Sequence, residues 1–272
     1  MSSSVRTMRP LLRRGNKSHR QLRCLQSLKR QRVTFSQQPP ATTSLTSVAM
    51  TTSQASSASP LFSRVAENLR DLQRRISETG RSLDEIRIVG VTKTFGTDAV
   101  RVARDVGLTC VGENYIDELA EKRGECLDVQ VAWHYLGALQ SNKIGRIVEN
   151  ADVICGVSRV KEIEKIASLR DGASIYIQVD YTSADGRNGA QESEVSNLVS
   201  RARELSLDVR GLMTVAPPEK EGARAAFSKL VVLADALDLK ERSMGMTDDL
   251  EIACELGSTE VRIGRALFGP RA

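Results

Sequence analysis

The chain has 272 residues, of which 40% are hydrophobic, and its 39 Lys and Arg against 34 Asp and Glu give a formal charge of +5. The charge is uneven: residues 1–36 hold ten of the basic residues and no acidic residue precedes Glu67, so the remainder has 29 basic and 34 acidic residues. This slightly acidic remainder gives no support to a nucleic-acid-binding surface, and no stretch reaches the ~18 apolar residues that span a membrane.

Residues 1–58 have the composition of a leader. The first part is rich in Arg, and 13 of the 27 residues from Val33 to Ser59 are Ser or Thr. This is typical of a mitochondrial or plastid transit peptide, so we predict a disordered extension that directs the protein to mitochondria, with the plastid as the alternative. A disordered basic tail would show the same low hydrophobicity and high charge. Initiation at Met50 would give a shorter, cytoplasmic product.

The cysteines and histidines predict neither disulfides nor a metal site. Five cysteines are scattered without a Cys-x-x-Cys pair, and the chain has two histidines. An odd number of cysteines without regular spacing argues against a disulfide framework, and so few histidines provide no obvious metal-ligand cluster.

The folded region is predicted to begin at Ser59-Pro60, because Ser suits a helix N-cap and Pro suits the first helical position. Apolar residues then recur at helical spacing, and Gly80 ends the segment. The predicted strands that follow are residues 86–92, 109–112, 132–137, 152–156, 174–180, 209–215, 242–246 and 260–264. The predicted helices between them are residues 98–106, 116–125, 141–150, 160–168, 192–205, 219–237 and 248–256.

Eight strands that alternate with helices predict one domain, residues 59–272, of the α/β class: a single parallel (β/α)8 TIM-type barrel. A doubly wound open sheet is the alternative. It needs only six strands, and the first strand is not followed by a glycine-rich dinucleotide-binding loop. In such barrels the active sites lie at the C-terminal ends of the strands.

Lys93 directly follows the first predicted strand. A lysine at this position can direct its amine into a cavity, where desolvation lowers the pKa of the amine. A neutral amine can condense with an aldehyde to form a Schiff base. Lysines are more often solvated surface charges, so the residues after the other strands decide between the two interpretations.

The loops after strands seven and eight suit a phosphate group, because this is where barrels often bind one. Gly245 and Gly264 allow close approach of backbone N–H groups, and Ser243 and Thr247 add hydroxyl donors. An ordinary turn with helix caps would use the same residue types. A phosphate site together with an aldehyde-reactive lysine points to pyridoxal 5′-phosphate.

Eight motifs make the chain similar to a known family. In order, they are Val91-Thr-Lys93-Thr, Gly112-Glu-Asn-Tyr115, Trp133-His-Tyr-Leu-Gly137, Leu139-Gln-Ser-Asn-Lys143, Gly211-Leu-Met-Thr214, Ser243-Met-Gly-Met-Thr-Asp-Asp249, Gly257-Ser258 and Val261-Arg-Ile-Gly264. From about Ser59 to Gly269 the chain resembles the pyridoxal phosphate homeostasis proteins (YggS/PROSC). The resemblance implies a barrel like the N-terminal domain of alanine racemase.

The resemblance also implies a set of cofactor-binding residues: Lys93, Asn114, Met213, Ser243, Arg262, Gly264 and Arg265. Lys93 would hold pyridoxal phosphate as a Schiff base, with Asn114 and Met213 beside the ring. Ser243 and the backbone of Gly264 and Arg265 would bind the phosphate.

Arg262 would approach the pyridine nitrogen. A guanidinium only donates hydrogen bonds, so it leaves this nitrogen unprotonated. An unprotonated ring is a poorer electron sink, which favours a non-catalytic carrier involved in intracellular cofactor homeostasis. We expect pyridoxal phosphate and apo forms of enzymes that use it as partners, and a monomer.

Two enzymatic functions are alternatives to the carrier role. An alanine-racemase-like enzyme acting on amino acids would carry a further β domain, for which the chain, ending at Ala272, leaves no room. A Schiff-base aldolase needs an acid/base relay beside its lysine, and none is evident near Lys93.

Several residues depart from the pattern of the family or invite a second interpretation. Arg265 stands where Thr or Ser is common, and Asp180 and Arg187 replace an Asn and a Lys. Each departure bears on affinity for the cofactor. His134 could shuttle protons, but a structural role is favoured, and Asp248 and Asp249 are predicted to cap a helix.

Overall fold

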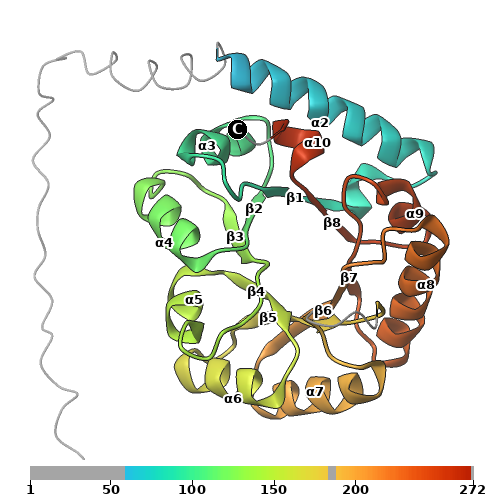
Figure 1. Ribbon diagram of the computed structural model, residues 1–272. Coiled ribbons are helices and arrows are strands. Elements are labelled where there is room, and N and C mark those ends of the chain that lie inside the picture. Colours follow the sequence, from blue (N-terminus) through green and yellow to red (C-terminus); the bar gives the residue numbers. More distant parts are fainter. Residues whose placement is uncertain (1–58, 183–187, 271–272) are drawn as a thin grey trace, which may run out of the picture. The chain divides into compact units, whose positions relative to one another are not determined.

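The computed structural model describes residues 59–182 and 188–270, and within them eight parallel strands close into a barrel in chain order (Figure 1). The strands are β1 (Arg87–Val91), β2 (Cys110–Glu113), β3 (Ala132–Tyr135), β4 (Val153–Val157), β5 (Ser174–Val179), β6 (Asp208–Thr214), β7 (Glu241–Ser243) and β8 (Glu260–Ile263). β8 pairs with β1 and closes the ring. The predicted TIM-type barrel is thereby confirmed.

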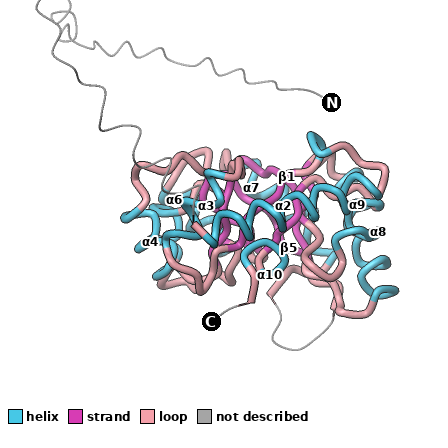
Figure 2. The backbone as a smooth tube through the Cα atoms, turned by 90° about the horizontal axis from the view of Figure 1, so that it is seen from above, coloured by secondary structure: helices cyan, strands magenta, loops and turns pink. Residues whose placement is uncertain are grey.

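Helices surround the strands, as the view from the side of the barrel shows (Figure 2). They are α2 (Pro60–Glu78), α3 (Thr97–Asp105), α4 (Ile116–Glu125), α5 (Ile144–Asn150), α6 (Val160–Leu169), α7 (Glu192–Glu204), α8 (Lys220–Ala236), α9 (Leu250–Glu255) and α10 (Arg265–Phe268), with a 3-10 turn η1 (Leu83–Glu85). The sequence predicted α2 to α9 to within a few residues, and it missed η1 and α10. No described helix is long and apolar enough to cross a membrane.

α2 begins as its sequence predicts. The Ser59 hydroxyl accepts a hydrogen bond from the Phe62 N–H at 3.0 Å, and Pro60 occupies the first turn. α2 packs against α3, α9 and α10 (Figure 1), and the Asn68 amide donates to the Leu267 carbonyl of α10. The helix that precedes β1 therefore takes a place in the ring of helices between α9 and α3, next to the four-residue α10.

β7 is the strand that departs most from its prediction. It covers Glu241–Ser243 instead of residues 242–246, and pairs with β8 at one position only. Gly245 has φ +101°, a left-handed conformation that ends the extended strand and that glycine adopts without strain. The short strand also lies very close to β6: a Cβ on Gly211 would lie 1.8 Å from the Glu241 carbonyl oxygen.

Two apolar clusters separate the inside of the barrel from its outside. The larger one packs the helices against the strands, and the smaller one lies within the barrel and includes Val91, Leu136 and Met213. Because side chains alternate along a strand, this division identifies which residues of each strand face the interior. The predicted leader, the internal start at Met50 and the departure at Arg187 lie outside the described residues.

Candidate functional site

Lys93 lies at the C-terminal mouth of the barrel, two residues after the interior residue Val91. The outward-facing Thr92 continues the ladder, since its N–H donates to the Gly112 carbonyl at 3.0 Å. Alternation therefore places Lys93 on the inward-facing side of the chain. Its partial burial agrees with a position at the rim of the barrel.

Three other predicted residues lie on neighbouring strands of the same interior. Arg262 of β8 is buried, and its guanidinium donates to the Ser243 carbonyl at 2.7 Å, to the Ser243 hydroxyl at 2.9 Å and to the Thr214 carbonyl at 2.7 Å. Met213 of β6 belongs to the interior apolar cluster. The structure thus joins Arg262 and Ser243 directly, and Arg262 is held by β6 and β7 together.

Glu260 connects Ser243 to a polar network deeper in the barrel. The Ser243 hydroxyl donates to Glu260 Oε1 at 2.7 Å, so its single proton is used within the protein. Glu260 Oε2 lies 3.2 Å from Arg87 Nη1 and accepts from the Tyr176 hydroxyl at 3.4 Å. Arg87 and Tyr176 also bind Glu241. Burial raises the pKa of Tyr176, which keeps the phenol protonated as a donor.

His134 and Cys155 join this network from β3 and β4. His134 Nδ1 lies 3.7 Å from Glu260 Oε2 and 3.8 Å from Cys155 Sγ, and all three side chains are buried. The sequence argument against a metal-ligand cluster overlooked this convergence of three ligand types. His134 Nε2 has no hydrogen-bond partner in the described chain, whereas a metal-bound histidine almost always donates its second N–H. The group therefore fits a core network better than a metal centre.

Because His134 is buried, we expect the free energy of unfolding to depend on pH. Burial lowers its pKa, so the folded protein binds fewer protons than the unfolded chain as the pH falls below ~6.5. Stability is then lost on acidification. Between pH 7.5 and 5.5, wild type should lose up to about 1.4 kcal/mol more unfolding free energy than His134→Asn. Urea unfolding at both pH values measures this difference, and equal losses in the two proteins would contradict it.

The loops after β7 and β8 meet at the mouth of the barrel. Asp249 is the N-cap residue of α9, but its carboxylate accepts from the Met246 N–H at 2.5 Å and does not cap the helix. The Asp248 carboxylate lies 3.2 Å from the Arg265 guanidinium, and both side chains are exposed. The prediction that both aspartates cap the helix is therefore confirmed for the position of Asp249 alone: its carboxylate binds within the loop after β7, and that of Asp248 pairs with Arg265.

A cluster of three charged side chains, two buried and one partly exposed, holds the residues on either side of Lys93. We call Glu113, Glu118 and Lys122 the β2–α4 cluster. The Lys122 amine contacts Glu113 Oε1 at 2.7 Å and Glu118 Oε2 at 3.0 Å. Burial raises the pKa of Glu113, although hydrogen bonds from Lys122 and Thr92 oppose this effect. Partial burial also disfavours ionised Glu118, but hydrogen bonds from the Thr94 N–H and from Lys122 outweigh it, and the pKa of Glu118 is lowered.

Thr94, which directly follows Lys93, has φ +67°. This left-handed conformation is unusual for a β-branched residue, and such strain costs about 1–3 kcal/mol. The Thr94 N–H donates to Glu118 Oε2 at 2.8 Å. A charge-assisted bond of this kind helps to offset the strain.

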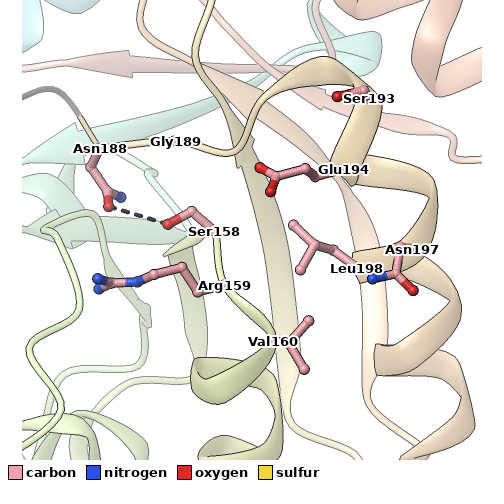
Figure 3. Close-up of a pocket in the computed structure, with 9 residues that line it drawn as sticks. All are labelled: Ser158, Arg159, Val160, Asn188, Gly189, Ser193, Glu194, Asn197 and Leu198. Atoms are coloured by element: carbon pink, nitrogen blue, oxygen red, sulfur yellow. Dashed lines mark hydrogen bonds between the residues drawn. The ribbon is translucent and has the colours of Figure 1, made fainter. Parts of the chain in front are cut away.

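A separate cavity of about 530 Å³ lies where β4 and β5 lead into α6 and α7 (Figure 3). Its lining comprises Ser158, Arg159, Val160, Asn188, Gly189, Ser193, Glu194, Asn197 and Leu198. The Ser158 hydroxyl donates to the Asn188 amide oxygen at 3.3 Å, as Figure 3 shows, and the Asn188 amide nitrogen donates to the Gly156 carbonyl at 3.0 Å. None of the seven predicted cofactor-binding residues lines this cavity.

Comparison with known proteins places this arrangement in a family. The sequence profile of the alanine racemase N-terminal domain matches residues 62–272. The pyridoxal phosphate homeostasis protein of Pseudomonas aeruginosa is 36% identical over 223 residues, which cover 77% of this chain and 97% of the relative. The chain belongs to the pyridoxal phosphate homeostasis protein family. The Escherichia coli K12 member is 33% identical over 228 residues, which cover 76% of this chain and 97% of the relative.

Solved structures of related proteins agree with this membership. PipY of Synechococcus elongatus, solved with pyridoxal phosphate bound, is 29% identical and superposes with a TM-score of 0.67 over 75% of this chain and 100% of PipY. Alanine racemase of Clostridium difficile superposes with a TM-score of 0.63 at 19% identity, over 75% of this chain and 57% of the racemase. At that identity the likeness shows the shared barrel, and the resemblance predicted from the motifs is confirmed at the level of the family.

Several residues that shape this site were not predicted from the sequence. Glu260 stands two residues before Arg262 in an inward-facing series, and Lys122 faces the barrel from α4. Charged residues within a fully buried parallel strand are a signal that could have identified Glu260. No local signal identifies its partners, because Arg87 and Ser243 lie 173 and 17 residues away along the chain.

Proposed function

We propose that this chain binds pyridoxal 5′-phosphate at the C-terminal mouth of the barrel and serves intracellular cofactor homeostasis as a monomeric carrier. The position of Lys93 after β1, in register with interior residues, is the observation that carries the proposal. The aldehyde of the bound cofactor would supply the electrophile for a Schiff base with the Lys93 amine. PipY, a relative that has been solved with pyridoxal phosphate, supports the choice of ligand.

The residues around Lys93 fit such a cofactor. Met213 and the interior residues Val91 and Leu136 offer an apolar wall to a ring, and Asn114 follows β2 at the same rim. Gly264 precedes α10, whose first backbone N–H groups have no acceptor within the helix. We assign phosphate binding to the backbone of Gly264 and Arg265.

Two assigned side chains need a more precise role than the motifs suggest. Ser243 donates its proton to Glu260, so phosphate contact through its hydroxyl requires release of that bond. In this arrangement Ser243 holds Arg262. The Arg265 guanidinium pairs with Asp248, which leaves its backbone N–H as the group assigned to the phosphate.

A carrier role fits Arg262 better than catalysis does. Its guanidinium is buried and donates to three acceptors of β6 and β7, and it has no lone pair with which to accept a proton from the pyridine nitrogen. An electron-poor ring, which decarboxylases and transaminases exploit, is therefore not favoured here. We propose binding and delivery to apo-enzymes without turnover. An alanine-racemase-like activity on amino acids is the alternative.

The visible absorption spectrum of the full chain mixed with pyridoxal phosphate tests the proposal. We expect a band that disappears on borohydride reduction, with the mass of the reduced cofactor added to the peptide that contains Lys93. A mixture with the spectrum of free pyridoxal phosphate, and no added mass, would contradict the proposal. Racemisation or decarboxylation of an amino acid by the loaded protein would favour the enzymatic alternative.

We further propose that residues 1–58 direct the protein to mitochondria, on the basis of their Arg-rich and Ser/Thr-rich composition. A fluorescent protein fused behind residues 1–58 should co-localise with a mitochondrial marker. Plastid fluorescence would favour the alternative compartment, and diffuse fluorescence would contradict a targeting role.

A further inference from the structure

The β2–α4 cluster contacts the chain on both sides of Lys93. On one side, the Lys122 amine donates to the Thr92 carbonyl at 2.8 Å, and the Thr92 hydroxyl donates to Glu113 Oε1 at 2.7 Å. On the other side, the Thr94 N–H donates to Glu118 Oε2 at 2.8 Å. Lys93 is therefore flanked by two residues that bind the same set of charges.

We propose that Glu118, held by Lys122 and Glu113, is a positioning residue that fixes the backbone of Lys93 for reaction with the cofactor aldehyde. The inference rests on the proposed function of Lys93. It assigns a role in cofactor loading to three side chains of β2 and α4 that lie on the outer side of the barrel wall, where none of them needs to touch the cofactor.

The backbone geometry after β1 indicates why the bond between Thr94 and Glu118 is needed. β1 ends at Val91, and the chain turns sharply, since Phe95 N–H donates back to the Thr92 carbonyl at 3.0 Å. Thr94 adopts φ +67° within this turn. Without the acceptor on Glu118, Thr94 can relax to the extended conformations that a β-branched residue prefers, and the direction in which the Lys93 side chain leaves the backbone changes with it.

The composition of the β2–α4 cluster favours a positioning role over a role in packing alone. Lys122 is 6% exposed and Glu113 is fully buried, and Glu113 Oε2 has no hydrogen-bond partner in the described chain. Buried ion pairs of this kind contribute little net stability compared with apolar side chains of similar size. They do specify one geometry, because each charged group is bound only when its partners are in place.

A comparison of Glu118→Ala with Glu118→Gln in the full chain tests this role. Glutamine retains an oxygen that can accept from Thr94 N–H, and alanine does not. Without cofactor, hydrogen exchange of the Thr94 amide should become about tenfold faster in Glu118→Ala. On addition of pyridoxal phosphate, the visible band should form about tenfold more slowly in Glu118→Ala and within about threefold of the wild-type rate in Glu118→Gln.

Arg123→Met provides the matched control. Arg123 follows Lys122 on α4 and pairs with Asp152 at 3.0 Å, away from Lys93. This variant removes an ion pair of the same helix and should leave both the exchange of Thr94 and the rate of band formation unchanged. Equal slowing in Arg123→Met and Glu118→Ala would reduce the effect to general destabilisation and overturn the inference.

The proposed function and this inference can fail separately. If wild-type protein forms no band that Lys93→Ala abolishes, the proposed function is wrong, and the positioning role falls with it. If wild type forms that band and Glu118→Ala forms it at the wild-type rate, only the positioning role is wrong.

Discussion

Lys93→Ala is expected to abolish the visible band that pyridoxal phosphate forms with the protein, together with the mass that borohydride adds to the chain. No other described lysine lies within two residues of the C-terminal end of a strand, on the inward-facing side at the mouth of the barrel. The cofactor contacts proposed for Arg262 and the Gly264 backbone would remain, so weak reversible binding should persist. Loss of the covalent bond should weaken the affinity by at least about tenfold, or ~1.4 kcal/mol.

Lys143→Ala is the control for this experiment. Lys143 lies in the loop after β3 and is partly exposed, with its amine 3.7 Å from Asp117. Its loss should leave the spectrum and the labelled peptide unchanged. A band that survives in Lys93→Ala, with label on another lysine, would place the covalent site elsewhere.

Glu260→Ala is expected to lower the free energy of unfolding by about 3 kcal/mol or more, because breaking a buried ion pair typically costs ~3–5 kcal/mol. The substitution removes the acceptor of the Ser243 hydroxyl and one acceptor of Arg87. Arg87 keeps its bond to Glu241 at 2.8 Å and is partly exposed, which places the expected loss toward the lower limit. Urea unfolding of the full chain measures this loss.

The exposed pair between Arg224 and Glu255 provides the comparison for Glu260. The Arg224 guanidinium and the Glu255 carboxylate also lie at hydrogen-bond distance, 2.8 Å, but both side chains are about half exposed. Glu255→Ala should cost less than about 1 kcal/mol, since solvent screens such pairs. Equal losses in the two variants would mean that Glu260 does not act as the centre of a buried network.

Glu260 also connects the stability of the barrel to the proposed cofactor site. It binds Ser243, and Ser243 holds Arg262. A Glu260 variant that still folds should therefore release Arg262 from one of its acceptors, so changes in stability and in cofactor affinity should accompany each other.

The amino-acid sequence by itself determined the order and kind of nearly all the elements, because strand and helix periods are local properties of the chain. It also placed Lys93 at a strand end, which the structure confirms. Motifs spread over the chain identified the family, because each of them is short and contiguous. The capping of α2 was equally predictable, since the Ser59 hydroxyl accepts from the N–H of Phe62, only one helical turn away.

Only the tertiary structure decided how distant residues meet. β7 is short because Gly245 leaves the extended conformation and because β6 approaches closely at Gly211. α2 completes the ring of helices although it precedes the first strand. Glu260 finds Arg87 across the closing pair of strands, and Lys122 reaches Thr92 from a helix 30 residues further along the chain. The physical reason is that a buried charge is unfavourable unless it is paired. Closure of the barrel determines which partner lies within reach.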